Sequence, residues 1–146
     1  MAKYMLILRP TDEAMANFEN VEFEEILATV GGFNDELIRA GVLLAAEGLD
    51  PEGSVVVDFT GEEVVVSDGP YGETKELFSG FWILEVSSKE EAAEWAKRCP
   101  LGPGSYLEVR RVHGEEDFPA DNEWIQKEEG WREEQAKRAQ GSGSEA

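Results

Sequence analysis

The chain has few of the residues that most readily carry catalysis, crosslinking or phosphate binding. It has 146 residues, with one cysteine, one histidine, and 13 lysines and arginines against 32 acidic residues. The single cysteine, Cys99, excludes a disulfide within the chain and favours a reducing compartment. The shortage of basic residues argues against binding to nucleic acid or to an anionic membrane, because both require cations to neutralise phosphates. The net charge of −19 favours solubility and leaves a basic protein partner open.

Long apolar runs are also absent. The longest, residues 4–8 and 42–46, have the length of strands, far below the roughly 20 residues that span a bilayer. The N-terminal residues lack the apolar stretch and cleavage site of a signal peptide. Apolar residues nevertheless make up 41% of the chain, enough for one globular domain with a core. We therefore expect a cytoplasmic protein that neither enters a membrane nor binds nucleic acid.

The spacing of apolar residues predicts alternating helices and strands. Residues 18–40 have the period of an amphipathic helix, in which Gly31 and Gly32 would require a kink or a close contact between helix and sheet. A second helix begins with a capping box at Ser88 and Glu91 and ends before Pro100. β-Branched runs on either side of Thr60 and Gly61 predict a hairpin. Further strands are expected at residues 4–8, 42–46, 78–86 and 106–110.

This order of elements predicts an α+β fold, a ferredoxin-like split βαβ sandwich with an extra β-hairpin and with its helices on one sheet face. The other face would expose valines and aromatic residues, so we expect a homodimer that covers it. The domain should span residues 1–112, followed by a linker at 113–121, a helical extension at 122–139 and a flexible tail at 140–146. Because two exposed tryptophans would be costly, Trp124 and Trp131 should dock the extension on its own domain or on the dimer partner.

One nine-residue segment carries a family resemblance. Residues 68–76, Asp-Gly-Pro-Tyr-Gly-Glu-Thr-Lys-Glu, resemble the DGPF-A-E-T-K-E signature of the YCII-related family, with Tyr71 in place of Phe and Gly72 in place of Ala. Matching stretches extend the resemblance over residues 3–112. It implies a ferredoxin-like subunit that forms a dimeric α/β barrel with clefts beside the sheets. It implies no secure activity.

A catalytic pair known in the family does not carry over to this chain. Some YCII relatives have a His–Asp pair that is suspected of acid–base catalysis, with the histidine on the first helix. Residues 18–40 contain no histidine, and the one histidine of the chain, His113, follows the last predicted strand.

The motif itself supplies the candidate site. Pro70 has a fixed φ and restricts the residue before it, so Asp68 should lie on a stiff turn at the end of a strand. In an extended segment Glu73 and Lys75 share a face, where they would form a charged pair near Asp68. Crowded carboxylates can acquire raised pKa values and act as acid or base. The candidate catalytic residues are Asp68 and Glu73, and the candidate ligand-binding residues are Glu47, Asp68, Tyr71, Glu73 and Lys75.

Three functional hypotheses follow, alongside a structural alternative. The leading one is a dimer that binds a small molecule in a cleft lined by residues 68–75, without cofactor or metal. The second is an enzyme that performs simple acid–base chemistry on a small organic substrate through Asp68 or Glu73. The third is a protein-interaction module with a basic regulatory partner, because family members often accompany extracytoplasmic-function sigma factors. In the structural alternative, Asp68 accepts hydrogen bonds of the turn, while Glu73 and Lys75 clamp a loop or the dimer.

The remaining conspicuous residues favour structural roles. Cys99 lies on the apolar face of a helix and should belong to the core. Trp82 and Trp95 should lie in the core or in an interface. His113 should be exposed, and the acidic run at 115–117 is expected to be solvated rather than to bind metal.

Overall fold

The computed structural model describes residues 1–50, 52–69 and 78–142, and every statement on structure concerns these residues. The chain divides into two compact units. The first comprises Met1–Val112 and the second begins at His113.

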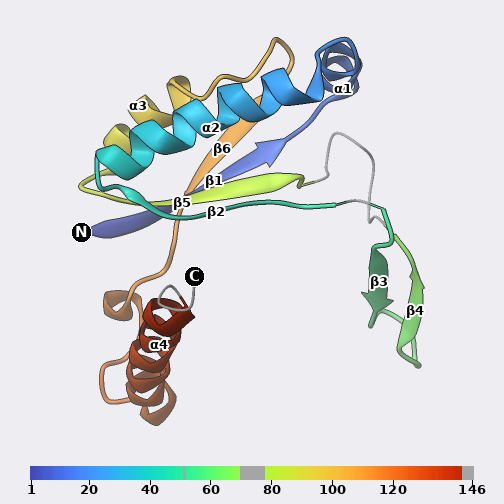
Figure 1. Cartoon of the computed structure of the whole chain (residues 1–146). Coiled ribbons are helices and arrows are strands. Elements are labelled where there is room, and N and C mark those ends of the chain that lie inside the picture. The colour runs from blue at the N-terminus through green and yellow to red at the C-terminus, as the bar shows by residue number, and fades with distance from the viewer. Residues whose placement is uncertain (51, 70–77, 143–146) are drawn as a thin grey trace. The chain divides into compact units, whose positions relative to one another are not determined.

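The first unit is built on an open, four-stranded antiparallel sheet (Figure 1). Its strands are β1 (Ala2–Arg9), β2 (Leu43–Gly48), β5 (Gly80–Val86) and β6 (Tyr106–Arg111), in the spatial order β2-β5-β1-β6. With helices on one of its faces, the sheet confirms the predicted α+β class. Within the chain it does not close into a barrel.

Three helices accompany this sheet: α1 (Asp12–Glu19), α2 (Phe23–Arg39) and α3 (Lys89–Lys97). All three lie on the same side of it (Figure 1). The side chain of Ser88 accepts a hydrogen bond from the Glu91 amide at 3.1 Å, so the predicted cap of α3 is confirmed.

The prediction of one helix over residues 18–40 was wrong at its beginning. Helix α1 begins at Asp12 and ends at Glu19, with Asn20 as its C-cap; at its start the hydroxyl of the N-cap Thr11 accepts a hydrogen bond from the Ala14 amide at 3.1 Å. Of the two explanations predicted for Gly31 and Gly32, a kink or a close contact with the sheet, the close contact was wrong, because a Cβ on either glycine would meet no other atom within 4 Å. Helix α2 runs through both glycines.

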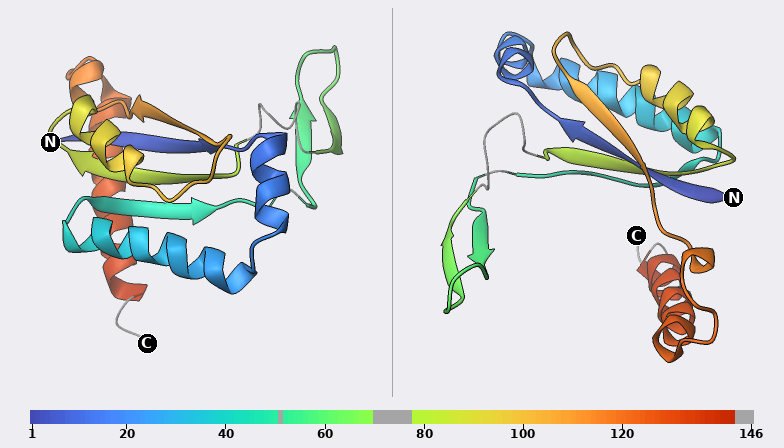
Figure 2. Two further views of the ribbon diagram at one scale, coloured as in Figure 1. Left: turned by 90° about the horizontal axis from the view of Figure 1, so that it is seen from above. Right: turned by 180° about the vertical axis from the view of Figure 1, so that it is seen from behind.

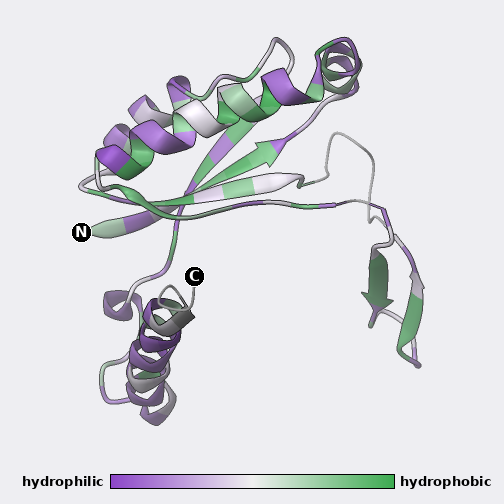
Figure 3. Cartoon of the chain, in the orientation of Figure 1, coloured by the Kyte–Doolittle hydropathy of each residue, from purple (hydrophilic) through white to green (hydrophobic). Residues whose placement is uncertain are grey.

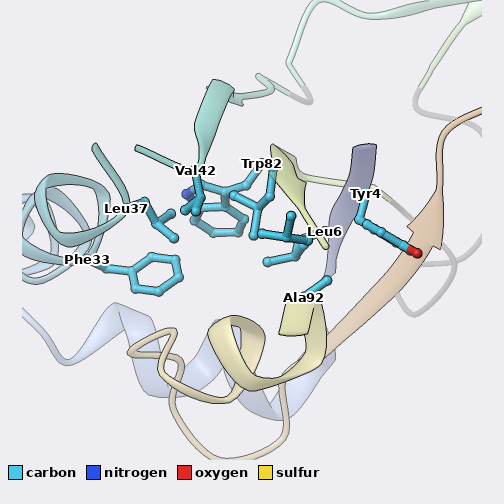
Figure 4. Close-up of a cluster of buried hydrophobic side chains, with 9 residues drawn as sticks. Tyr4, Leu6, Phe33, Leu37, Val42, Trp82 and Ala92 are labelled. Atoms are coloured by element: carbon cyan, nitrogen blue, oxygen red, sulfur yellow. The ribbon is translucent and has the colours of Figure 1, made fainter. Parts of the chain in front are cut away.

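The hydrophobic core lies between the sheet and the helices (Figure 4). Side chains alternate along β5, so that Trp82, Leu84 and Val86 face α2 and α3. From α2, Phe33 meets Trp82 edge to face with ring centroids 5.7 Å apart. Leu37 and Leu84 are fully buried. The prediction that Trp82 belongs to the core is confirmed.

The opposite face of the sheet holds a mixed surface. Across the strands, Met5 pairs with Ile83 and Ile7 with Phe81, and these positions alternate with the core positions. On the same face Glu108 accepts a hydrogen bond from Arg9 at 2.8 Å. Among the described elements of the first unit, no helix covers this side (Figure 2).

The hairpin predicted around residues 60 and 61 is confirmed. Strands β3 (Val55–Asp58) and β4 (Val65–Asp68) pair with each other and form a separate two-stranded sheet. Three of the four residues of β3 and two of the four residues of β4 are valines, and the apolar parts of both strands can be followed in Figure 3. Val55 and Val66 are nevertheless 62% and 63% exposed, so the hairpin adds little to the core.

The second unit contains the short helix η2 (Glu115–Asp117) and the long helix α4 (Glu123–Ser142). Helix α4 extends three residues beyond the predicted end at residue 139. The rings of Trp124 and Trp131 lie 6.4 Å apart and are 62% and 50% exposed. Their docking on another surface stays a prediction. His113 is exposed, as predicted. None of the described helices is long and apolar enough to cross a membrane.

Candidate functional site

A cavity of about 550 Å³ opens at one end of the four-stranded sheet. There β1 and β2 end, β5 begins, and α1 lies across the strand ends (Figure 2). Residues from these three strands, from both N-terminal helices and from the loop at 100–103 line it. The cavity therefore belongs wholly to the first unit.

The cavity exists because the strands carry glycine and alanine at helix-facing positions. Larger side chains at these positions would fill the space between the sheet and the helices. Gly48 of β2 pairs with Gly80 of β5, and Ala46 pairs with Trp82. Gly80 lies two positions before Trp82 and shares its helix-facing side. A Cβ on Gly80 would lie 3.2 Å from the backbone oxygen of Glu47, so this position has little room for a side chain.

The polar centre of the cavity is a hydrogen bond between the sheet and α2. The indole Nε1 of Trp82 donates to Oδ1 of Asn34 at 2.7 Å, and both residues line the cavity. Trp82 is only 6% exposed, so this bond satisfies a donor that would otherwise be buried without a partner. It also fixes the Asn34 side chain.

Most of the other lining residues are apolar, among them Leu8, Phe18, Phe81 and Leu101. The charged residues among the described lining are two carboxylates, Glu25 and Glu47, and both are exposed at the edge. Within that described set there is no lysine, arginine or histidine. The cavity thus offers an apolar interior with acidic groups near solvent.

The residues predicted for the site are only partly placed by the structure. Glu47 borders the cavity, but it lies in β2, paired with Phe81, so the prediction of a loop there was wrong. Asp68 is the last residue of β4 and is exposed. It is not among the described lining residues, and its side chain has no described hydrogen-bond or ion-pair partner. Tyr71, Glu73 and Lys75 lie outside the described residues.

The first glycine of the motif has a steric role. The amide of Gly69 donates to the backbone oxygen of Ser54 at 2.8 Å, which brings the two segments together beside the hairpin. A Cβ on Gly69 would lie 2.8 Å from the Ser54 hydroxyl oxygen and 3.3 Å from Cγ2 of Val56. Only glycine allows this approach without a shift.

Comparison with known proteins decides the family. The model of the YCII-related domain matches residues 2–116. The chain belongs to the YCII-related family. The uncharacterized protein R00369 of Rhizobium meliloti (strain 1021) is 28% identical to it over 109 residues, which are 71% of this chain and 87% of that protein. The predicted family membership is confirmed.

The cavity falls entirely inside the YCII-related domain, since its described lining extends from Leu8 to Pro103. Most of its lining residues, among them Asn34, Phe18 and Ser79, were not predicted from the sequence. One signal was available. Asn34 directly follows Phe33 on the apolar side of an amphipathic helix, where an amide needs a partner.

Other reactive groups in the YCII-related domain have structural roles. Cys99 packs against the core, as predicted, and burial raises the pKa of its thiol to about 12. It is therefore a poor nucleophile. Among the described residues, no group of histidine, cysteine, aspartate or glutamate side chains could hold a metal ion.

Proposed function

We propose that this YCII-related protein binds a small, mainly apolar molecule in the cavity beneath α1 and α2. The observation that carries the proposal is the contrast between a mainly apolar space of about 550 Å³ and the hydrogen-bonded side-chain pair Asn34 and Trp82 that lines it. Small-molecule sites typically measure about 300–1,000 Å³ and combine apolar walls with a few placed polar groups.

Packing energetics support a ligand. Protein interiors are close-packed, and an unfilled apolar cavity costs stability because its walls lose dispersion contacts. A larger side chain at Gly48 could restore these dispersion contacts, since Gly48 lines the cavity and a Cβ on it would meet no atom within 4 Å. A larger residue would fit at that position. Retaining glycine keeps the space open for an occupant.

The family motif supports the same location. Residues 68–76, which we assign to the DGPF signature, precede Ser79 by three positions, and Ser79 lines the cavity. The amide of Ser79 donates to the Leu8 oxygen at 3.1 Å, and the Leu49 amide donates to the Ser79 oxygen at 2.9 Å. These bonds fix the point at which the chain re-enters the sheet after the motif.

Cavity filling tests the proposal directly. The probe is N-phenyl-1-naphthylamine, an uncharged dye whose fluorescence rises in apolar surroundings. We expect saturable binding to the full chain, and Gly48→Leu should weaken it at least about tenfold, because the leucine would occupy the space of the dye. Gly31→Leu is the matched control, since Gly31 is exposed on α2 and does not line the cavity.

The two variants distinguish the outcomes. Equal weakening by Gly48→Leu and Gly31→Leu, or unchanged binding in the Gly48 variant, would show that the dye binds elsewhere and would overturn the proposal. Thermal melts of both variants verify that each is folded.

We also propose the finer architecture: a ferredoxin-like subunit whose open sheet face pairs with a second copy to form a dimeric α/β barrel. The strand order β2-β5-β1-β6 and the helices on one face support the subunit topology. The apolar positions Met5, Ile7, Phe81 and Ile83 on the uncovered face support the pairing. Light scattering should return twice 16.2 kDa, and Ile83→Glu should return the single mass. A monomeric parent chain at micromolar concentration would refute the dimer.

A further inference from the structure

The orientation of the Asn34 carboxamide is determined by its partner. Indole Nε1 carries a hydrogen and can only donate, so the atom of Asn34 that lies 2.7 Å from it must be the oxygen. Trp82 is itself held by β5 and by the edge-to-face contact with Phe33. The carboxamide therefore has its acceptor engaged and its two N–H donors left on Nδ2.

These donors are open to the cavity. Asn34 lines the cavity, and no described residue accepts a hydrogen bond from its Nδ2. In the described part of the chain, the buried side-chain polar atom without a partner is Ser105 Oγ, so Nδ2 is not sealed inside the protein. It is an accessible donor pair on a rigid support, set among apolar and aromatic walls.

We infer that the cavity selects uncharged aromatic molecules that carry an oxygen acceptor, and that Asn34 Nδ2 is the group that recognises this oxygen. The inference rests on the proposed function of the cavity. The aromatic part of such a ligand would lie against Phe18 and Trp82, which line the cavity. A carbonyl oxygen would supply the acceptor that Nδ2 lacks.

The charges at the cavity favour the same ligand class. On the helix-covered side, the charged residue of the described lining is Glu25, and the described lining holds no lysine, arginine or histidine, so an anionic ligand would meet a carboxylate and no counter-charge. Glu47 contributes from β2 as the partner of Phe81, whose side chain faces the opposite side of the sheet. An ammonium group would be attracted to the Glu25 carboxylate, but Nδ2 cannot accept a hydrogen bond from it. A neutral carbonyl matches both the donor and the absence of positive charge.

A matched set of ligands tests the inference on the full chain. The set comprises naphthalene, 2-acetylnaphthalene, 2-naphthoate and 2-naphthylmethylammonium, which share one ring system and differ in the polar group. Displacement of the dye gives each affinity. We expect 2-acetylnaphthalene to bind about three- to tenfold more tightly than naphthalene, the usual effect of one net hydrogen bond. The naphthoate anion should bind most weakly.

Two variants isolate the donor. Asn34→Asp keeps an oxygen that accepts from Trp82 Nε1 but removes the N–H donors, so the preference for 2-acetylnaphthalene over naphthalene should disappear. Asn17→Asp adds the same charge at the cavity and leaves Asn34 intact, so the preference should persist there. Melting curves of both variants confirm folding.

The outcomes separate this inference from the proposed function. If neither the dye nor any naphthalene derivative binds, the proposed function itself fails. If naphthalene binds but 2-acetylnaphthalene has no advantage, the cavity binds ligands and the assignment to Asn34 is overturned. An advantage that survives Asn34→Asp, or tightest binding by the anion or by the ammonium compound, would overturn it as well.

Discussion

The two ends of the helix-covered sheet face are built from the same strands and packed in different ways. At the filled end, Leu84 and Val86 of β5 meet Tyr4 of β1 and Ala92 of α3 in a dense cluster. At the hollow end, the same face of β5 begins with Gly80, opposite another glycine, and a cavity takes the place of side chains. The filled end accounts for stability, and the hollow end is where a ligand can bind.

Truncation of a leucine at each end should give the largest contrast. Leu84 is fully buried, so Leu84→Ala should lower the free energy of unfolding by about 3 kcal/mol through lost burial and a new cavity. Leu8 is half-buried and already borders a cavity, so Leu8→Ala should cost about half as much or less. Urea denaturation measures both, and equal losses would show that the hollow end is not underpacked.

A methyl group on each of the paired glycines should give a smaller difference. The Cβ of Gly80→Ala would lie 3.2 Å from the Glu47 backbone oxygen, whereas that of Gly48→Ala would meet nothing within 4 Å. We expect Gly80→Ala to be less stable than Gly48→Ala by about 1 kcal/mol. Thermal melts of the two variants provide the comparison. Identical stability of the two variants would mean that the backbone of β2 at Glu47 shifts at little cost to make room for the methyl group.

The smallest effect is expected on the opposite face of the sheet, where a substitution should change how the melting temperature depends on pH. Hydrogen bonds from Arg9 and then from Arg110 lower the pKa of Glu108. A carboxyl group with a lowered pKa in the folded state contributes stability above its ordinary pKa, and this contribution is lost as the pH falls through the folded-state value. Arg9→Gln should therefore reduce the drop in melting temperature between pH 7 and pH 3.

Arg39→Gln provides the control for this measurement. It removes the same charge from an exposed pair with Asp35 on α2. An equal change in the acid sensitivity of both variants would indicate a general effect of net charge rather than an effect of Glu108.

The sequence predicted the elements of the fold because each leaves a local pattern. Alternation marked β6, a capping box marked the start of α3, and β-branched runs marked the hairpin. The break between α1 and α2 was missed because the apolar period continues across it. Tertiary packing decides such breaks, and periodicity does not report them.

The site was much less predictable than the fold. The cavity is formed by absent side chains, at Gly48 and Gly80, which become neighbours only through the register of β2 on β5. That register joins two strands that are far apart in the sequence, so neither segment reveals it by itself. The motif drew attention to Asp68, whose acidity suggested chemistry, whereas the structure brings Asn34 and Trp82 together inside the cavity.

The central position of β1 has a consequence for the order of events during synthesis. Strand β1 pairs with β5 on one side and with β6 on the other, so both of its partners lie in the later part of the chain. Pairing between such distant segments slows folding, because the intervening loop must close first. At a translation rate of roughly 5–20 residues per second, β1 would wait about 5–20 seconds for its last partner. β5 can pair with one edge of β1 first, but the other edge stays unpaired until β6 has left the ribosome.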